Sequence, residues 1–345
     1  MKSIVFRADG AKKMGMGHLN RCYLIASYLK SYYGIPSILI TKKDSASRLF
    51  LSSKASIFKV IYIDKSRIIK HELKVFSDLE KNGELLLILM DLLEIETEIG
   101  NEYLNSLRKL DIPVCVISDD SNYHEFSADL IINGNPNQVG NDYLSALGKY
   151  LIGPKYFIMD PDYANLSEHC QTENRIIVSL GGSDHNNIIF PTLNSLVKIS
   201  NVQEIVVISS KSTGYADKLS LFSLNCSNKK IKLYFDVESL SAYWNSCSMA
   251  ITAGGNTLFE RIASGIPGAT ICQLSRQMEI ADAFEKLGVN INLGYGPILN
   301  ANKLDVLISE FFENKEGHDK QRALSKRVVA GEGLKYCTKE MLKLL

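Results

Sequence analysis

The chain has 345 residues, of which 46% are hydrophobic and 22% charged, as in an ordinary globular protein. Its net charge of +1 gives no electrostatic reason to expect nucleic acid or an anionic membrane as the main partner. No apolar run is long enough to span a bilayer, and the opening MKSIVFRADG lacks the pattern of a signal peptide. We therefore expect a cytoplasmic protein.

The seven cysteines form no C-x-x-C pair, and two of them, Cys115 and Cys272, lie inside apolar runs. An odd number of unpatterned thiols favours a reducing compartment and argues against a disulfide scaffold or structural zinc. The six histidines show no metal-ligand spacing. The sequence therefore predicts neither a structural metal nor a cofactor.

Apolar runs of strand length recur along the first half of the chain, at residues 3–8, 36–41, 59–63, 85–91, 113–118 and 128–133. Segments of helical length separate them, and residues 17–34 carry apolar side chains at helical spacing. Residues 150–164 break this pattern with two prolines and a glycine, which is typical of a linker. A second alternation follows, with apolar runs at residues 174–179, 204–209, 230–236, 248–252, 268–274 and 289–294. The sequence pattern of residues 300–345 then predicts helices.

This alternation predicts an α/β protein with parallel sheets covered on both faces. We expect two Rossmann-like domains that face each other across a cleft, at residues 1–155 and 156–330. The C-terminal helix, at about 330–345, can pack back on the first domain. Open α/β sheets bind ligands at the carboxyl ends of their strands, so the ligand is expected in the cleft.

Three glycine turns follow predicted strands: Gly15 and Gly17, Gly181 and Gly182, and Gly254 and Gly255. The first is neither a G-x-G-x-x-G fingerprint nor a P-loop. Glycine is common after a strand, because such turns often need a positive φ. Three turns that each precede a helix nevertheless favour a phosphate-bearing ligand, which a helix N-terminus stabilises by about 0.3–2 kcal/mol. After the second turn, Ser183 or Asp184 can cap the next helix.

His18 stands at the first of these turns, where a helix begins. A histidine is more often structural than catalytic, but this position favours a catalytic role. We expect the positive helix end to lower the pKa of His18 and keep the imidazole neutral, as a general base requires. Asp9, just past the strand, is expected to orient the ring or to cap the loop. The remaining histidines are expected in polar surroundings, with His185 as a solvated cap and the others, His71, His124, His169 and His318, at the surface.

After the third turn, Gly255 is followed by Asn256 and by a helix that Thr257 opens. Glu260 is expected on the first turn of that helix. There it either accepts hydrogen bonds from a ribose diol or supplies only a favourable charge. Gln277 is expected near the start of a later helix.

Segments 6–22, 178–187, 251–267 and 276–288 resemble, in order and spacing, the UDP-sugar hydrolases of pseudaminic acid biosynthesis. This family cleaves UDP-2,4-diacetamido-2,4,6-trideoxy-β-L-altropyranose to the free sugar and UDP. Its fold is GT-B, as in the transferase that attaches N-acetylglucosamine to lipid I. The resemblance covers most of the chain, and the opening R-[AS]-D…G-x-G-H-x-x-R-C pattern is specific. It also implies a place in the pathway that supplies flagellin glycosylation.

The resemblance implies that His18 is the catalytic residue, activating a water that attacks the anomeric carbon with inversion, without a metal. UDP would bind the second domain, with Glu260 near the ribose and Gln277 near the phosphates or the sugar. The residues expected to bind substrate are Asp9, Gly15, Gly17, Arg21, Gly181, Gly182, Ser183, Gly254, Gly255, Asn256, Thr257, Glu260 and Gln277.

The chain departs from the family pattern at three positions on or near the sugar side. Leu93 replaces the usual tyrosine of an Asp-x-Tyr motif after the fourth strand, Asp160 replaces a basic residue, and Phe259 precedes Glu260 where relatives vary. The assignment of UDP as the nucleotide is therefore better supported than the assignment of the sugar.

Two other functions stay open. One is a glycosyltransferase that passes the sugar to an acceptor, for which residues 41–48 offer a candidate surface. The other is a nucleotide-sugar sensor without catalysis. Incubation with UDP-sugars, with and without an acceptor, distinguishes all three.

Overall fold

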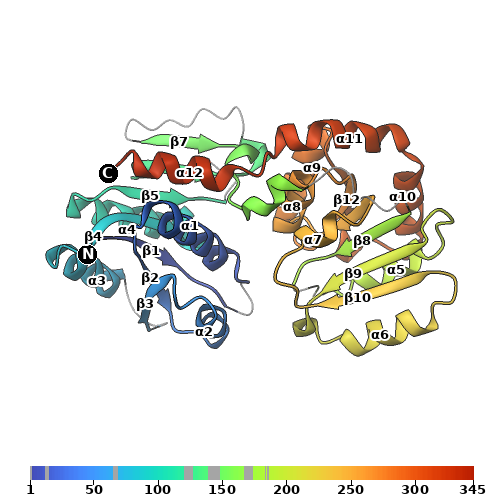
Figure 1. The fold of residues 1–345 in the computed structure, drawn as a ribbon, viewed down its shortest axis with the longest axis horizontal. Coiled ribbons are helices and arrows are strands. Elements are labelled where there is room, and N and C mark those ends of the chain that lie inside the picture. Colours follow the sequence, from blue (N-terminus) through green and yellow to red (C-terminus); the bar gives the residue numbers. More distant parts are fainter. Residues whose placement is uncertain are drawn as a thin grey trace. The chain divides into compact units, whose positions relative to one another are not determined.

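The computed structural model describes residues 2–11, 15–64, 69–119, 127–138, 148–166, 174–182, 184 and 186–345, with the side chains of Glu94, Glu96 and Ala164 left aside. Internal contacts divide the chain into two compact units. Unit 1 comprises Met1–Asp160 and Glu332–Leu345, and unit 2 comprises Pro161–Gly331. The first boundary lies inside the stretch 150–164 that the sequence predicts as a linker. Each unit is an α/β layer structure with its own parallel sheet (Figure 1).

Unit 1 contains a seven-stranded parallel sheet in the order β3-β2-β1-β4-β5-β6-β7. Its strands are β1 (Ser3–Ala8), β2 (Ser37–Lys42), β3 (Phe58–Ile63), β4 (Leu85–Asp91), β5 (Val114–Ile117), β6 (Leu130–Asn133) and β7 (Lys149–Ile152). The first six coincide with the predicted apolar runs. The seventh was not predicted, because its short sequence KYLI merges into the Pro/Gly-rich stretch. The strand order reverses between β1 and β4, which is where doubly wound sheets bind ligands.

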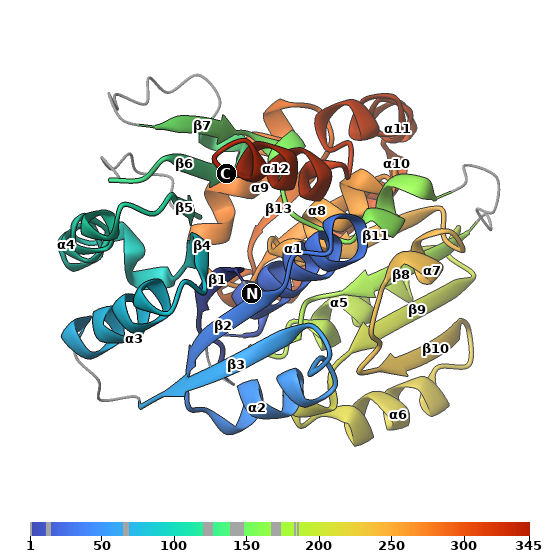
Figure 2. The ribbon, with the colours of Figure 1, turned by 60° about the vertical axis from the view of Figure 1, so that its left-hand side comes forward.

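Helices cover both faces of this sheet, as alternating apolar side chains on the strands require. Ile4 and Phe6 of β1 pack in a core with helix α1, whereas Val5 packs in the opposite core with α3 and α4. Figure 2 shows α3 and α4 beside the strands on one side and α1 on the other. The helices of unit 1 are α1 (Gly17–Tyr33), α2 (Ser45–Ser52), α3 (Ile69–Lys81), α4 (Glu98–Leu107) and α12 (Gly333–Leu342), with short 3-10 helices η1 (Leu93–Glu96), η2 (Arg108–Leu110), η3 (Pro136–Gln138) and η4 (Pro154–Tyr156).

The C-terminal helix α12 belongs to unit 1, although the chain has by then passed through unit 2. It lies against α1 and η4 (Figure 1). Leu334, Cys337 and Met341 share one face of α12 by their spacing and are buried in the core that α1 also lines. Burial of these side chains explains physically why the chain returns to unit 1.

Unit 2 contains a six-stranded parallel sheet in the order β10-β9-β8-β11-β12-β13. Its strands are β8 (Arg175–Ser179), β9 (Glu204–Ser209), β10 (Lys230–Phe235), β11 (Met249–Thr252), β12 (Gly268–Cys272) and β13 (Ile291–Tyr295). All six were predicted. Its helices are α5 (Ile189–Leu196), α6 (Ala216–Asn225), α7 (Ser241–Trp244), α8 (Asn256–Ala263), α9 (Arg276–Lys286), α10 (Ala301–Glu313) and α11 (Lys315–Val328), with 3-10 helices η5 (Pro161–Asn165), η6 (Lys211–Thr213) and η7 (Gly296–Ile298).

Two smaller predictions have opposite outcomes. Cys115 and Cys272 are buried in their strands, and burial raises the pKa of both thiols, as expected of apolar core positions. The prediction of a surface His318 is wrong: α11 is amphipathic, and it buries this ring 4.8 Å from the Phe311 ring. His71 is exposed, whereas His124 and His169 lie outside the described residues. None of the helices in the described part of the chain has the length and apolarity that crossing a lipid bilayer requires.

Candidate active site

His18 and Asp91 meet at the point where the strand order of unit 1 reverses. Asp91 is the last residue of β4 and pairs in register with Ala8, the last residue of β1. The chain leaves β1, passes the glycine turn and enters α1 at Gly17, so His18 lies at the carboxyl end of the same two strands. Its Nδ1 is 2.6 Å from Asp91 Oδ1. Because a carboxylate only accepts, the proton of the neutral imidazole lies on Nδ1, and Nε2 then has the lone pair that a general base needs.

Arg21, one helical turn after His18, holds the same carboxylate from a second direction. Its Nε and Nη2 donate to Asp91 Oδ2 and Oδ1 at 3.0 and 2.7 Å. Its Nη1 and Nη2 also donate to Asp119, just past β5, at 2.6 and 2.8 Å. The backbone carbonyl of Asp119 in turn accepts from Asn135, which follows β6. This network joins four neighbouring strand ends, and it fixes the orientation of the Asp91 carboxylate beside the imidazole.

The electrostatic surroundings of His18 differ from the prediction. Burial by itself lowers the pKa of His18, but the hydrogen bond from Nδ1 to Asp91 and the charge of that carboxylate outweigh burial, so the net shift is upward. The expectation that the helix end lowers this pKa is therefore wrong. The Asp91 carboxylate is fully buried and hydrogen-bonded to the ring, so it acts on the imidazole more strongly than partial charges at the end of a helix.

Asp9 does not touch the imidazole, and the prediction that it orients the ring is wrong. Its side chain points back along β1, where Oδ1 lies 2.7 Å from Arg7 Nη1. The same oxygen accepts from the backbone N–H of Lys42 at 2.7 Å. Asp9 therefore joins the ends of β1 and β2, and Arg7 holds the pKa of its carboxyl below the usual value against the effect of burial. The orienting function belongs to Asp91.

In the first glycine turn, Gly15 is the residue that needs the backbone freedom of glycine. Its φ is +88°, and its N–H donates to the Ala11 carbonyl at 2.8 Å. A Cβ at Gly15 would meet no atom of the described residues within 4 Å. Gly17 is the first residue of α1, and the N-cap residue Met16 supplies no side-chain hydrogen bond to the first turn.

In unit 2, the predicted residues gather at the carboxyl ends of three neighbouring strands. Gly181, with φ +84°, and Gly182 follow β8; Gly254 and Gly255 follow β11; Gln277 follows β12. A Cβ at Gly254 would lie 2.8 Å from Gln277 Cβ, so this glycine lets the turn pack against α9. Gln277 Oε1 accepts from the backbone N–H of Gln273 at 2.8 Å.

Helix α8 begins one residue earlier than predicted, at Asn256, with Thr257 next. Glu260 is the fifth residue of α8, so it follows the first turn instead of lying on it. Its side chain is half-buried. Ser183 and His185 lie outside the described residues.

Asp184 organises the turn after β8. Its two carboxylate oxygens accept from the backbone N–H groups of Ile188, which is the N-cap residue of α5, and of Ile189, at 3.0 and 2.9 Å. The same carboxylate also accepts from Tyr215 Oη at 3.2 Å and from Gln273 Nε2 at 2.9 Å. These two partners were not predicted. They tie the glycine turn to β12 and to α6.

Sequence reasoning missed Asp91 and Asp119. The available signal was their position, since each is an acidic residue at or just after the end of an apolar run, in LLLILMD and VCVISD. Of the three family departures, Leu93 is 44% exposed in η1, whereas Phe259 is buried against the ring of Phe284 at 5.0 Å. Phe259 is thus a core residue.

The known proteins that are similar to this chain have low sequence identity to it, but the similarity extends over most of the chain. No family model matches the chain. An uncharacterized protein of Methanocaldococcus jannaschii is 26% identical to this chain. The matched region covers 82% of this chain and 58% of that protein. The UDP-2,4-diacetamido-2,4,6-trideoxy-beta-L-altropyranose hydrolase of Campylobacter jejuni is 22% identical over 85% of this chain and 99% of its own. A Helicobacter pylori protein named as a pseudaminic acid cytidylyltransferase and the same hydrolase is 24% identical over 96% of this chain and 54% of its own.

Solved structures identify the fold. MurG of Acinetobacter baumannii superposes with a TM-score of 0.69 at 12% identity, covering 99% of both chains. The spinosyn rhamnosyltransferase SpnG, complexed with thymidine diphosphate, gives 0.67 at 13% identity, covering 98% of this chain and 100% of its own. The chain therefore has the GT-B fold, and the resemblance to the UDP-diacetamido-trideoxy-altropyranose hydrolases is confirmed by the similarity of the chain to proteins of that name.

Proposed function

We propose that this protein hydrolyses a UDP-linked diacetamido-trideoxy hexose, releasing UDP and the free sugar, in a pathway of the pseudaminic acid type. One observation carries the proposal: His18 Nδ1 lies 2.6 Å from Asp91 Oδ1 at the strand-order reversal of unit 1. A histidine held in this way presents an unprotonated Nε2, which is the requirement for activating water. The names of the Campylobacter and Helicobacter relatives supply the substrate class.

In the proposed reaction, the oxygen of a water molecule attacks the anomeric carbon while the bond from that carbon to the UDP oxygen breaks. The electron pair of the broken bond leaves with UDP, and the water proton moves to His18 Nε2. Asp91 stabilises the imidazolium that forms, as the carboxylate of a Ser-His-Asp triad does. A single displacement of this kind inverts the anomeric centre, and as the resemblance implies, it uses no metal ion.

Unit 2 is proposed to bind the nucleotide. Support comes from Gly181, Gly254 and Gly255 at the carboxyl ends of neighbouring strands, and from the N-terminus of α8, which has no side-chain cap. Backbone N–H groups at such positions bind phosphate. Glu260 is proposed to accept hydrogen bonds from the ribose diol, and Gln277 to approach the phosphates or the sugar.

A glycosyltransferase is the second candidate, because both solved structures described above are of the transferase fold. It would use the same base on an acceptor hydroxyl instead of water. The run 41–48, considered as an acceptor surface, contains the end of β2 and the N-cap of α2, where Asp44 accepts from the Ala46 N–H at 2.9 Å. The Asp44 carboxylate in this run therefore has a local structural partner.

Incubation with the UDP-linked sugar in ¹⁸O-water tests the proposal. Hydrolysis incorporates one ¹⁸O at the anomeric position and releases UDP without an acceptor. His18→Ala should lower this turnover by roughly 10²–10⁴-fold, whereas His71→Ala, an exposed histidine on α3, should not change it. UDP release that requires an acceptor would favour the transferase, and unaltered turnover in His18→Ala would refute the function of His18.

A further inference from the structure

Leu93 is an exposed leucine that lies close to the candidate active site. Asp91, whose carboxylate contacts His18 Nδ1, ends β4, and Leu93 opens η1 two residues later. Because an extended chain spans at most about 3.3–3.6 Å for each residue, the Cα atoms of Asp91 and Leu93 are no more than about 7 Å apart. Leu93 is 44% exposed. A ligand that reaches His18 at the carboxyl end of β4 therefore approaches this leucine as well.

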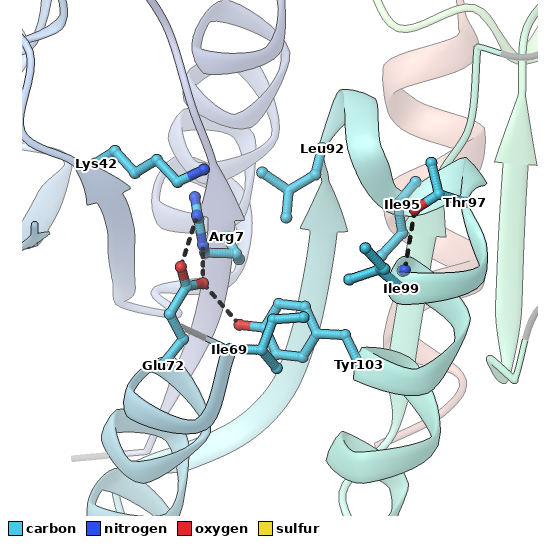
Figure 3. A pocket seen from close by; sticks show the side chains of 10 residues that line it. Arg7, Lys42, Ile69, Glu72, Leu92, Ile95, Thr97, Ile99 and Tyr103 are labelled. Carbon is cyan, nitrogen blue, oxygen red and sulfur yellow. Dashed lines mark hydrogen bonds and ion pairs between the residues drawn. The ribbon is translucent and has the colours of Figure 1, made fainter. Parts of the chain in front are cut away.

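The residues on either side of Leu93 hold it at the surface. Leu92 and Ile95 are buried in the core that α3 and α4 line, and the Ile95 N–H donates to the Leu92 carbonyl at 3.1 Å. Residues three apart in a 3-10 turn share one face. Figure 3 shows Leu92 and Ile95 among the side chains that line a cavity of about 370 Å³ on this side of the sheet. Leu93 is not among the residues that line this cavity or form the cores described for unit 1.

The alternation of side chains along β4 places the exposed leucine relative to the base. Leu89 packs in the core that α1 lines, and Met90 packs in the opposite core. Asp91 comes next and lies on the α1 side, in agreement with its contact to His18 on α1. The regular alternation ends there, and the chain continues into η1 with Leu93 exposed just past the strand end.

The polar groups that hold His18 are used within the protein. Both oxygens of Asp91 accept hydrogen bonds, from His18 or from Arg21. Arg21 donates in addition to Asp119. A sugar group that lies over Leu93 finds neither a donor nor an acceptor in that side chain. A hydroxyl in this place would lose its hydrogen bonds to water without a replacement, whereas a methyl group would gain by leaving water.

We infer that Leu93 is a specificity-determining residue: it contacts a methyl group of the sugar and favours that methyl group over a hydroxymethyl group. This inference rests on the proposed function, since it takes the ligand at His18 to be the sugar of that substrate. A diacetamido-trideoxy hexose offers two kinds of methyl group, at the deoxygenated C6 and at the end of each acetamido group. Both kinds present the same apolar surface to a leucine.

Two matched pairs of UDP-linked sugars test the contact and distinguish its two sources. The members of the first pair differ only at C6, which carries a methyl group in one and a hydroxymethyl group in the other. The members of the second pair differ only in the acyl groups, which are acetyl in one and hydroxyacetyl in the other. In one of these pairs, the parent protein should release UDP from the methyl member with a kcat/KM at least about fivefold higher, the lower end of the cost of burying a hydroxyl without a partner.

Leu93→Asn places an amide, which offers the hydroxyl a hydrogen-bond partner, in a side chain of similar size. It should bring the kcat/KM ratio of that pair to within about twofold of one. Because both members are compared in the same protein, a smaller folded fraction of the variant cancels from the ratio. Leu49→Asn changes a leucine that is 76% exposed on α2 and is the matched control, with the parental ratio expected.

Loss of the ratio in the first pair assigns the contact to the C6 methyl, and loss in the second pair assigns it to an acetyl methyl. A parental ratio near one in both pairs, or a ratio that Leu93→Asn leaves unchanged, would overturn the inference. The proposed function fails separately, by an absence of UDP release from every one of these sugars. Calorimetric affinities for the same sugars then give both ratios without turnover, so that result still tests the leucine contact.

Discussion

Replacement of Asp91 by asparagine tests the candidate active site most directly, because it keeps the shape of the side chain and removes its charge. Asp91 is fully buried, and its two oxygens accept from His18 Nδ1 and from Nε and Nη2 of Arg21. An amide has only one oxygen. Both oxygens of Asp91 face an Arg21 donor, Oδ2 facing Nε and Oδ1 facing Nη2, so the amide nitrogen of Asp91→Asn faces one guanidinium N–H in either orientation. Where the amide nitrogen takes the place of Oδ1, it also faces His18 Nδ1.

In the orientation that keeps the oxygen at His18, the imidazolium loses the negative charge that stabilises it; the other orientation forces the wrong tautomer on the imidazole. Facing an N–H donor, Nδ1 must accept, so the proton moves to Nε2 and the ring no longer has a lone pair toward the water. The same substitution in a Ser-His-Asp triad costs about 10⁴-fold in kcat. We expect turnover by Asp91→Asn to fall roughly 10²–10⁴-fold, the range for loss of a positioned base.

The pH dependence of the residual activity provides an independent readout. The pKa of His18 in the native protein is raised above its usual 6.5 by Asp91, against the effects of burial and of Arg21. A general base must be neutral, so turnover of the parent falls as the pH drops through this raised pKa. In Asp91→Asn, burial and the charge of Arg21 still lower the pKa of His18, so the acid limb should move to lower pH.

The contribution of Asp91 to stability should be largest at low pH, whereas turnover needs a pH above the pKa of His18. A histidine whose pKa is raised by folding contributes stability that is complete below its unfolded pKa and lost as the pH rises through the folded value. The difference in unfolding free energy between parent and Asp91→Asn should therefore be larger at pH 5 than at pH 8. Removing one partner of a buried ion pair costs about 3–5 kcal/mol, and Arg21 keeps its second partner, Asp119. Urea unfolding at both pH values measures this difference.

Asp119→Asn is the matched control, since it removes a carboxylate from the same arginine at a site that is 45% exposed. Its turnover should stay within tenfold of the parent. A folded Asp91→Asn protein with parental turnover and an unshifted acid limb would refute the assignment of Asp91 as the residue that positions His18.

Two further predictions concern unit 2. Glu260→Ala should weaken UDP binding by about 1.5–3 kcal/mol, the contribution of hydrogen bonds to a charged group, and leave the affinity for 2′,3′-dideoxy-UDP unchanged; calorimetry showing equal UDP affinity for both proteins would rule out the ribose contact. Gly254→Ala should cost about 1–3 kcal/mol in urea unfolding, because the added Cβ would lie 2.8 Å from Gln277 Cβ and 3.2 Å from Cys272 Sγ. Gly182→Ala, where a Cβ meets no atom of the described residues within 4 Å, is its control, and equal stability losses would contradict the packing argument.

Local pattern was enough to predict twelve of the thirteen strands, the α/β class and the position of His18 at a strand end. Apolar runs of strand length and glycine turns depend on residues close together in the chain, and they are visible without knowing what packs on them. The strand that was missed, β7, is only four residues long and lies at the edge of its sheet, where little burial is needed to define its sequence.

The partner of His18 depended on tertiary structure alone. Asp9 is nearer in sequence and was expected to orient the ring or to cap the loop, yet Asp91, 73 residues away, makes the contact. That choice follows from the pairing of β1 with β4, which places Ala8 beside Asp91, while Arg7 draws the Asp9 carboxylate to the other side of the strand end. Sheet order and register bring together residues that no sequence window contains. For the same reason, the charge that determines the pKa of His18 is a property of the folded chain.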